Sequence, residues 1–132
     1  LADLVREIAV TLVEASGRDD IALELDLAPY RIRPRAAGPL ALVVNEAVSN
    51  ALRHAFPSRA GTLALRIVRE GEDLIVAVED DGVGLNATTD GSFGATLIDV
   101  LSRQVGGTCR VHPRDPAGTA LEFRFPAEPI RA

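Results

Sequence analysis

The stretch 40–57 carries four polar side chains at helical spacing: Glu46, Asn50, Arg53 and His54. At about 100° per residue, residues that lie four, three and one apart project from neighbouring turns of one helix face. An acid, an amide, a cation and an imidazole on one face can hold a metal ion and phosphate groups. Because asparagine is an indifferent helix former, Asn50 in the middle of a long helix indicates a functional role. For this stretch alone, an ordinary amphipathic helix with a polar outer side is an equally good interpretation.

A second pattern is Asp80-x-Gly82-x-Gly84, which directly follows a β-rich run. Two closely spaced glycines let the backbone approach a flat ligand. A carboxylate at a strand end can accept hydrogen bonds from an exocyclic amine. Taken alone, the pattern also fits a plain acidic glycine turn.

Two glycine-led segments complete the set of candidates. Gly91 and Gly94 open a helical stretch, and the free N–H groups and dipole at a helix start suit phosphate, although glycine also serves as a plain cap. The residues before them, 86–92, are small and polar, which is typical of a mobile loop. Gly118-Thr119 opens the last strand, where the threonine hydroxyl could reach a ligand or belong to an ordinary strand residue.

Apolar periodicity predicts the elements that must position these groups. On the 40–57 helix it forms one core-facing stripe: Leu40, Val44, Ala47, Val48, Ala51 and Ala55. Further helices are expected over 1–15 and 94–105, strands over 21–27, 62–69, 74–80, 108–112 and 119–125, and a proline- and arginine-rich connector over 30–39. Short turns imply antiparallel strands, and one-sided helices must cover a sheet. We expect an α/β (α+β) two-layer sandwich, a mostly antiparallel mixed sheet with three helices on one face.

Composition narrows the class of protein. The 132 residues fit one domain over 1–132, and 47% hydrophobic with 25% charged residues excludes a disordered acidic tail. A net charge of −5 without a basic run argues against nucleic-acid binding. No apolar run is long enough to span a membrane, and the charged start is unlike a signal peptide. We therefore expect a cytoplasmic domain without direct membrane contact.

Two residue types are informative by their number. The single cysteine, Cys109, cannot form an internal disulfide and has no sulfur neighbour for a metal site, so a buried thiol is expected. All 14 basic residues are arginine, so a protein cation at a phosphate must be an arginine. The chain starts at Leu1 rather than at a methionine, which suggests a piece of a longer protein.

In chain order, these motifs resemble the ATP-binding domain shared by histidine kinases, type II topoisomerases, a heat-shock chaperone and mismatch-repair ATPases. The resemblance covers nearly the whole chain and is greatest to the catalytic domain of bacterial sensor histidine kinases, in the branch with a short lid. The run VVNEAVSNALRHAFP resembles that branch's N box, DDGVGL its G1 box, and GSFGATLIDVLSRQVGGT its G2 region with the next strand.

The resemblance implies a site for ATP and Mg²⁺. Asn50 would ligate the Mg²⁺ that bridges the phosphates, and Glu46 would support the metal or act as a base. Arg53 and His54 would line the phosphates. A lid between the strand end and the third helix, made of the loop 86–93, would close over them.

The same resemblance implies an adenine pocket at the second motif. Asp80 would receive the adenine amino group, with Thr119 and a water behind it. Gly82 and Gly84 would flank the purine, and Gly94 would join the lid over the phosphates.

In that family the γ-phosphoryl group passes to a histidine on a separate dimerisation domain and then to an aspartate of a response regulator. Nothing in 1–132 resembles the dimerisation domain, because His54 belongs to the N box and His112 to a strand. The expected function is therefore that of an ATP-dependent protein histidine kinase domain, whose phosphoacceptor lies elsewhere in the full-length protein.

Two alternatives stay open at this point. Anti-sigma-factor-type serine kinases resemble this fold and also carry a Glu-x-x-x-Asn helix, although the QVGG segment is more similar to the histidine-kinase branch. A degenerate, non-catalytic adaptor would keep the fold for protein contacts. The retained acid, amide and G1 residues argue against an adaptor, whereas the sparse glycines of the G2 region leave it open.

Overall fold

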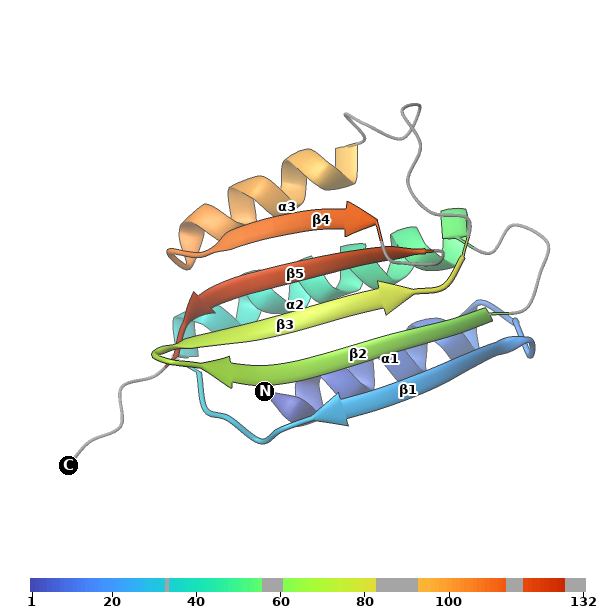
Figure 1. Cartoon of the computed structure of the whole chain (residues 1–132), viewed down its shortest axis with the longest axis horizontal. Coiled ribbons are helices and arrows are strands. Elements are labelled where there is room, and N and C mark those ends of the chain that lie inside the picture. Colours follow the sequence, from blue (N-terminus) through green and yellow to red (C-terminus); the bar gives the residue numbers. More distant parts are fainter. Residues whose placement is uncertain (33, 56–60, 83–92, 114–117, 128–132) are drawn as a thin grey trace.

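The computed structural model in Figure 1 describes residues 1–32, 34–55, 61–82, 93–113 and 118–127, and of 54–55 and 93–98 the backbone alone. In chain order its elements are α1 (Ala2–Ala15), β1 (Ile21–Leu27), α2 (Pro34–Asn50), the short π-helix η1 (Ala51–Ala55), β2 (Gly61–Glu70), β3 (Asp73–Asp80), α3 (Phe93–Gln104), β4 (Thr108–Pro113) and β5 (Thr119–Pro126). Within these described parts, no helix combines the length and the apolar character that a membrane span needs.

The described strands form one sheet in the order β1-β2-β3-β5-β4. β1 and β2 are parallel because α2 connects them as a crossover, whereas the other three strand pairs are antiparallel. All three α-helices lie on one face of this sheet (Figure 1). The expected two-layer α/β sandwich, with a mixed and mostly antiparallel sheet, is confirmed.

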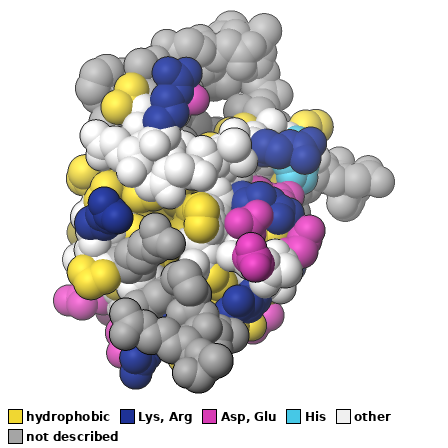
Figure 2. Space-filling view, turned by 90° about the vertical axis from the view of Figure 1, so that its left-hand side faces the viewer, with side chains coloured by type: hydrophobic (Ala, Val, Ile, Leu, Met, Phe, Trp, Pro, Cys, Tyr) yellow, Lys and Arg dark blue, Asp and Glu magenta, His cyan; other side chains and the backbone are white. Residues whose placement is uncertain are grey.

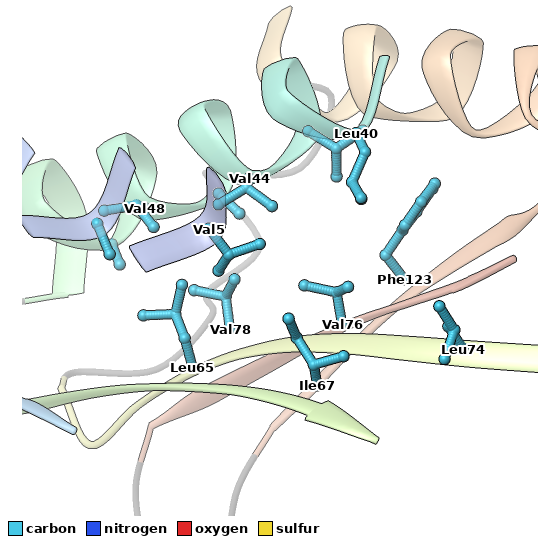
Figure 3. Packing of buried hydrophobic residues seen from close by; sticks show 14 of the residues in the cluster. Val5, Leu40, Val44, Val48, Leu65, Ile67, Leu74, Val76, Val78 and Phe123 are labelled. Carbon is cyan, nitrogen blue, oxygen red and sulfur yellow. The ribbon is translucent and has the colours of Figure 1, made fainter. Parts of the chain in front are cut away.

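The hydrophobic core fills the space between α2 and the sheet. Figure 3 shows the apolar stripe of α2 pointing toward side chains of three strands: Leu65, Ile67, Leu74, Val76, Val78 and Phe123. In the stripe, Leu40, Val44 and Val48 are at most 1% exposed, and Ala47 and Ala51 are also buried. Because each fully buried aliphatic side chain contributes about 1.5–3 kcal/mol, this stripe fixes α2 on the sheet. The predicted stripe is confirmed, except that the side chain of residue 55 lies outside the described atoms.

The start of α2 corrects one prediction. The segment 30–39 was expected to be a connector, but the helix begins at Pro34 and includes Pro39. Proline is well tolerated in the first turn of a helix, where its missing N–H has no helical partner. Farther along, Pro39 costs one backbone hydrogen bond. Burial of Ala36 and Leu40 against the core favours the helical conformation in spite of these prolines.

The end of the same helix is wider than an α-helix. Residues 51–55 form the π-helical turn η1, whose hydrogen bonds join residues five apart in sequence instead of four. The expected helix end at Phe56-Pro57 lies outside the described residues. π-Helical turns are frequent at functional sites, and this one carries Arg53.

The sheet face opposite the helices is covered by ion pairs. They join neighbouring strands: Arg66–Glu79 at 2.8 Å, His112–Glu122 at 2.7 Å, Arg124–Glu70 at 3.0 Å and Arg124–Asp73 at 3.3 Å. Figure 2, with this face at its right, shows acidic and basic side chains side by side. Beneath them, Ile75 and Ala77 are buried. Charged side chains with long aliphatic stems thus cover the second face of β3 without a further layer of helices.

Candidate functional site

One end of the molecule gathers the ends of four elements. The η1 turn after α2, the end of β3, the start of α3 and the start of β5 all lie at the right in Figure 1. This follows from chain direction, since α2 and β3 run toward that end and β5 runs away from it. The motifs predicted from separate parts of the sequence are therefore carried to the same end.

The acid, amide and cation of the 40–57 stretch form one contact group. Arg53 Nη2 donates a hydrogen bond to Asn50 Oδ1 and lies 3.6 Å from Glu46 Oε1. The Glu46 side chain is 18% exposed and that of Arg53 is 56% exposed, so the group is open on the arginine side. The predicted convergence of these three residues on one helix face is confirmed.

The carboxylate of Asp80 lies on the helix-facing side of the sheet. Asp80 is the last residue of β3 and alternates onto the same face as the core residues Val76 and Val78. It is 6% exposed, and its Oδ1 accepts a hydrogen bond of 3.0 Å from the Gly82 N–H. Its cross-strand partner is Thr119, the first residue of β5. The structure thus places a buried carboxylate directly opposite a threonine, at the end of the sheet near η1.

The neighbouring acid, Asp81, has a positioning contact that the sequence analysis missed. The Asp81 N–H donates to the Thr62 carbonyl at 3.3 Å, as in an antiparallel strand pair. The second hydrogen bond of such a pair, from the Thr62 N–H back to residue 81, has a different acceptor. The Thr62 N–H donates to Asp81 Oδ1 at 2.7 Å instead of to a main-chain carbonyl. The side chain therefore ends the β2-β3 ladder and lets the backbone turn away just after Asp80. The sequence did contain a signal for this contact. Asp80 and Asp81 are adjacent, and adjacent residues of a strand point to opposite faces, so the two acids could not both face the same site.

Gly118 touches this strand end from the other side. Its φ of +111° is unfavourable for residues with a side chain, and a Cβ at this position would overlap the Asp80 carbonyl oxygen. The same Cβ would lie 2.8 Å from the Cα of Asp81. The absence of a side chain at residue 118 therefore permits the close approach of β5 to the β3 end.

Two side-chain oxygen atoms at this end are of the kind that the Mg²⁺ implied by the resemblance would need. Asn50 Oδ1 and Glu46 Oε1 come from successive turns of α2 and lie close to the same guanidinium nitrogen. Both side chains are partly exposed. Amide and carboxylate oxygens are suitable Mg²⁺ ligands, and Mg²⁺ in proteins usually combines one or two such ligands with water and phosphate oxygens.

Some predicted site residues cannot be placed in full. Gly84 and the loop 86–92 lie outside the described residues, as does the side chain of His54. Gly94 is described as the second residue of α3. Their expected roles stay predictions.

The two other residues considered in the sequence, Cys109 and His112, lie on β4. Burial raises the pKa of the Cys109 thiol to about 12, so it is protonated and inert at neutral pH. A hydrogen bond to the Glu122 carboxylate raises the pKa of His112. Both observations agree with structural roles for these residues in the strand.

Comparison with known proteins identifies the family. The family model described as "Histidine kinase-, DNA gyrase B-, and HSP90-like ATPase" matches residues 36–129. Blue-light-activated histidine kinase 2 of Erythrobacter litoralis (strain HTCC2594) is 34% identical over 125 residues, which are 90% of this chain and 36% of the relative. The nitrate/nitrite sensor protein NarX of Escherichia coli (strain K12) is 27% identical over 107 residues, 80% of this chain and 17% of the relative. The chain thus spans about a third or less of these relatives.

Solved structures agree with this assignment. The histidine kinase domain of the Erythrobacter litoralis EL346 blue-light activated histidine kinase superimposes with a TM-score of 0.84 at 31% identity, covering 93% of this chain and 59% of that one. The mycobacterial sensor histidine kinase MprB shares the fold, with a TM-score of 0.80 at 18% identity over 97% of this chain and 95% of that one. The chain belongs to the histidine kinase-, DNA gyrase B- and HSP90-like ATPase family, and the relatives named here are sensor proteins and histidine kinases.

Proposed function

We propose that this domain binds Mg²⁺-ATP and donates the γ-phosphoryl group to a histidine on a separate dimerisation domain. The observation that carries the proposal is the pairing of buried Asp80 with Thr119 at the end of the sheet where η1 lies. An acid suited to a base edge and an acid-amide-cation group suited to phosphates are thus located at one end of one domain.

At the adenine side, the proposed role of Asp80 is to accept a hydrogen bond from the exocyclic amine. The Gly82 N–H donates to Asp80 Oδ1 at 3.0 Å, which helps to fix the orientation of the carboxylate. The proposed role of Thr119, the partner of Asp80 across the β3-β5 pair, is to complete the contact through a water. Gly82 and Gly84 would allow the backbone to lie flat against the purine.

At the phosphate side, the proposed metal ligand is Asn50 Oδ1, supported by the carboxylate of Glu46. Mg²⁺, when bound, neutralises charge on the β- and γ-phosphates. Arg53 supplies a positive charge from the same face, and His54, Gly94 and the loop 86–93 keep the phosphate roles that the resemblance implies. These residues position the nucleotide and stabilise charge; no covalent intermediate on this chain is needed.

The proposed reaction breaks the bond between the γ-phosphorus and ADP and forms a bond from phosphorus to an imidazole nitrogen of the acceptor histidine. A response-regulator aspartate is the proposed final acceptor. The names of the relatives, which are sensor proteins and histidine kinases, support the histidine kinase over the anti-sigma serine kinase.

Replacing the proposed metal ligand (Asn50→Ala) is expected to remove the metal-dependent part of ATP binding. The Kd for ATP in Mg²⁺ should rise by roughly 100-fold, while the Kd in EDTA should not change. Calorimetric titration of ATP with and without Mg²⁺ measures both values. Asn45→Ala, an exposed residue of the same helix, is the matched control and should bind as the wild type does. Wild-type Mg²⁺-ATP affinity in Asn50→Ala would remove Asn50 from the metal.

Replacing the proposed base acceptor (Asp80→Asn) is expected to weaken the preference for ATP over GTP. An amide can present either a donor or an acceptor, so the selectivity ratio should fall roughly 10- to 100-fold. Competition of ATP and GTP for the site measures this ratio. Asp81→Asn makes the same chemical change at the neighbouring residue and retains a side-chain oxygen to accept the Thr62 N–H. The selectivity of this variant for ATP over GTP should therefore equal that of the wild type. Equal ratios for Asp80→Asn and the wild type would contradict the adenine assignment.

A further inference from the structure

We infer that the Arg53 guanidinium competes with Mg²⁺ for Asn50 Oδ1, so that the metal ion binds together with the nucleotide rather than before it. The inference rests on the proposed Mg²⁺-ATP site and adds the order of binding to it. It is based on one observation: the nitrogen Arg53 Nη2 lies close to side-chain oxygens of both Asn50 and Glu46, the two residues proposed to hold the metal.

The geometry makes the two cations alternatives. Arg53 Nη2 donates to Asn50 Oδ1 and is 3.6 Å from Glu46 Oε1, so a positive charge already lies between the amide and the carboxylate. A divalent ion that coordinated the same Oδ1 would lie within a few ångströms of the guanidinium, and two cations at that separation repel each other strongly. Metal coordination therefore requires Arg53 to move.

Phosphate groups supply the reason for that movement. The Arg53 side chain is 56% exposed, and ion pairs of such exposure are weak. A phosphate accepts a guanidinium through two parallel hydrogen bonds, which are stronger than a single bond to an amide oxygen. Nucleotide phosphates would therefore draw Arg53 off Asn50, and the released Oδ1 would become a metal ligand in the same event.

A titration of Mn²⁺ without nucleotide, followed by the paramagnetic signal of the free ion, tests the competition. Arg53→Gln removes the charge and is expected to bind Mn²⁺ on the order of fivefold more tightly than the wild type. With a non-hydrolysable ATP analogue present, the order should reverse, because Arg53→Gln lacks the phosphate contact. Arg103→Gln, which removes an equal charge from an exposed Arg103–Asp99 pair on α3, is the matched control and should behave as the wild type in both titrations.

The outcomes separate this inference from the proposed function. A gain of Mn²⁺ affinity in Arg53→Gln alone supports the competition. Unchanged Mn²⁺ affinity in Arg53→Gln, or an equal gain in Arg103→Gln, overturns it while wild-type binding of the metal-nucleotide complex still stands. If the wild type binds no metal-nucleotide complex, the proposed function fails and the inference fails with it.

Discussion

The variant Gly118→Ala is expected to destabilise the domain by about 3 kcal/mol and to abolish its preference for ATP over GTP. Two costs add at this residue: a left-handed φ of +111° and a Cβ that overlaps the carbonyl oxygen of Asp80. Backbone strain and overpacking each cost roughly 1–3 kcal/mol. Relief requires the β3 end to move away from β5, which shifts the Asp80 carboxylate that we propose binds adenine. Urea unfolding and nucleotide competition measure the two effects.

Gly71→Ala is the matched control for this prediction. Gly71, in the β2-β3 turn, has a φ of +62°, and a Cβ there meets no atom within 4 Å. It therefore carries the cost of backbone strain alone, about 1 kcal/mol, and should leave the nucleotide preference unchanged. Equal losses of stability in the two variants, with the ATP preference intact in both, would show that the contact between Gly118 and Asp80 has no energetic weight.

The variant Val48→Asp is expected to prevent cooperative folding. Val48 is fully buried near the C-terminal end of α2 and faces core side chains of β2 and β3 (Figure 3). The substitution buries an unpaired carboxylate, at a cost on the order of 4 kcal/mol or more, and also removes buried apolar surface. Because small domains are stable by only about 5–15 kcal/mol, most of the stability would be lost. Circular dichroism during heating should show no sigmoidal transition, or one with a greatly lowered Tm.

The control for this prediction is the same chemical change on the outer side of the same helix. Leu42 is 50% exposed, so Leu42→Asp should change the free energy of unfolding by no more than about 0.5 kcal/mol. A Val48→Asp protein that melts cooperatively near the temperature of Leu42→Asp would contradict the assignment of the α2 core face.

Sequence periodicity was sufficient for the elements whose pattern is local. The alternating apolar residues of 21–27 predicted β1 with its observed bounds, and the spacing of Leu40, Val44 and Val48 predicted the buried side of α2. The start of α2 was wrong because Pro34 and Pro39 are strong local signals against helix. The burial that outweighs them involves strands that are distant in sequence, so no local pattern reports it.

The candidate site also has a part that the sequence predicted and a part that it did not. The contact of Glu46, Asn50 and Arg53 was predictable because all three lie within about two turns of a single helix. The π-helical turn that bears Arg53 was not predicted, since η1 has no distinctive sequence pattern.

By itself, the sequence determined which chemical groups are present in this protein. It also determined the helix that brings an acid, an amide and an arginine together. Only the tertiary structure decided that Asp80 lies opposite Thr119, that Asp81 binds the Thr62 N–H, and that Gly118 touches the Asp80 carbonyl. The physical reason is strand register: pairing of strands that are distant along the chain sets these contacts, and a shift by one residue would turn every side chain to the other face.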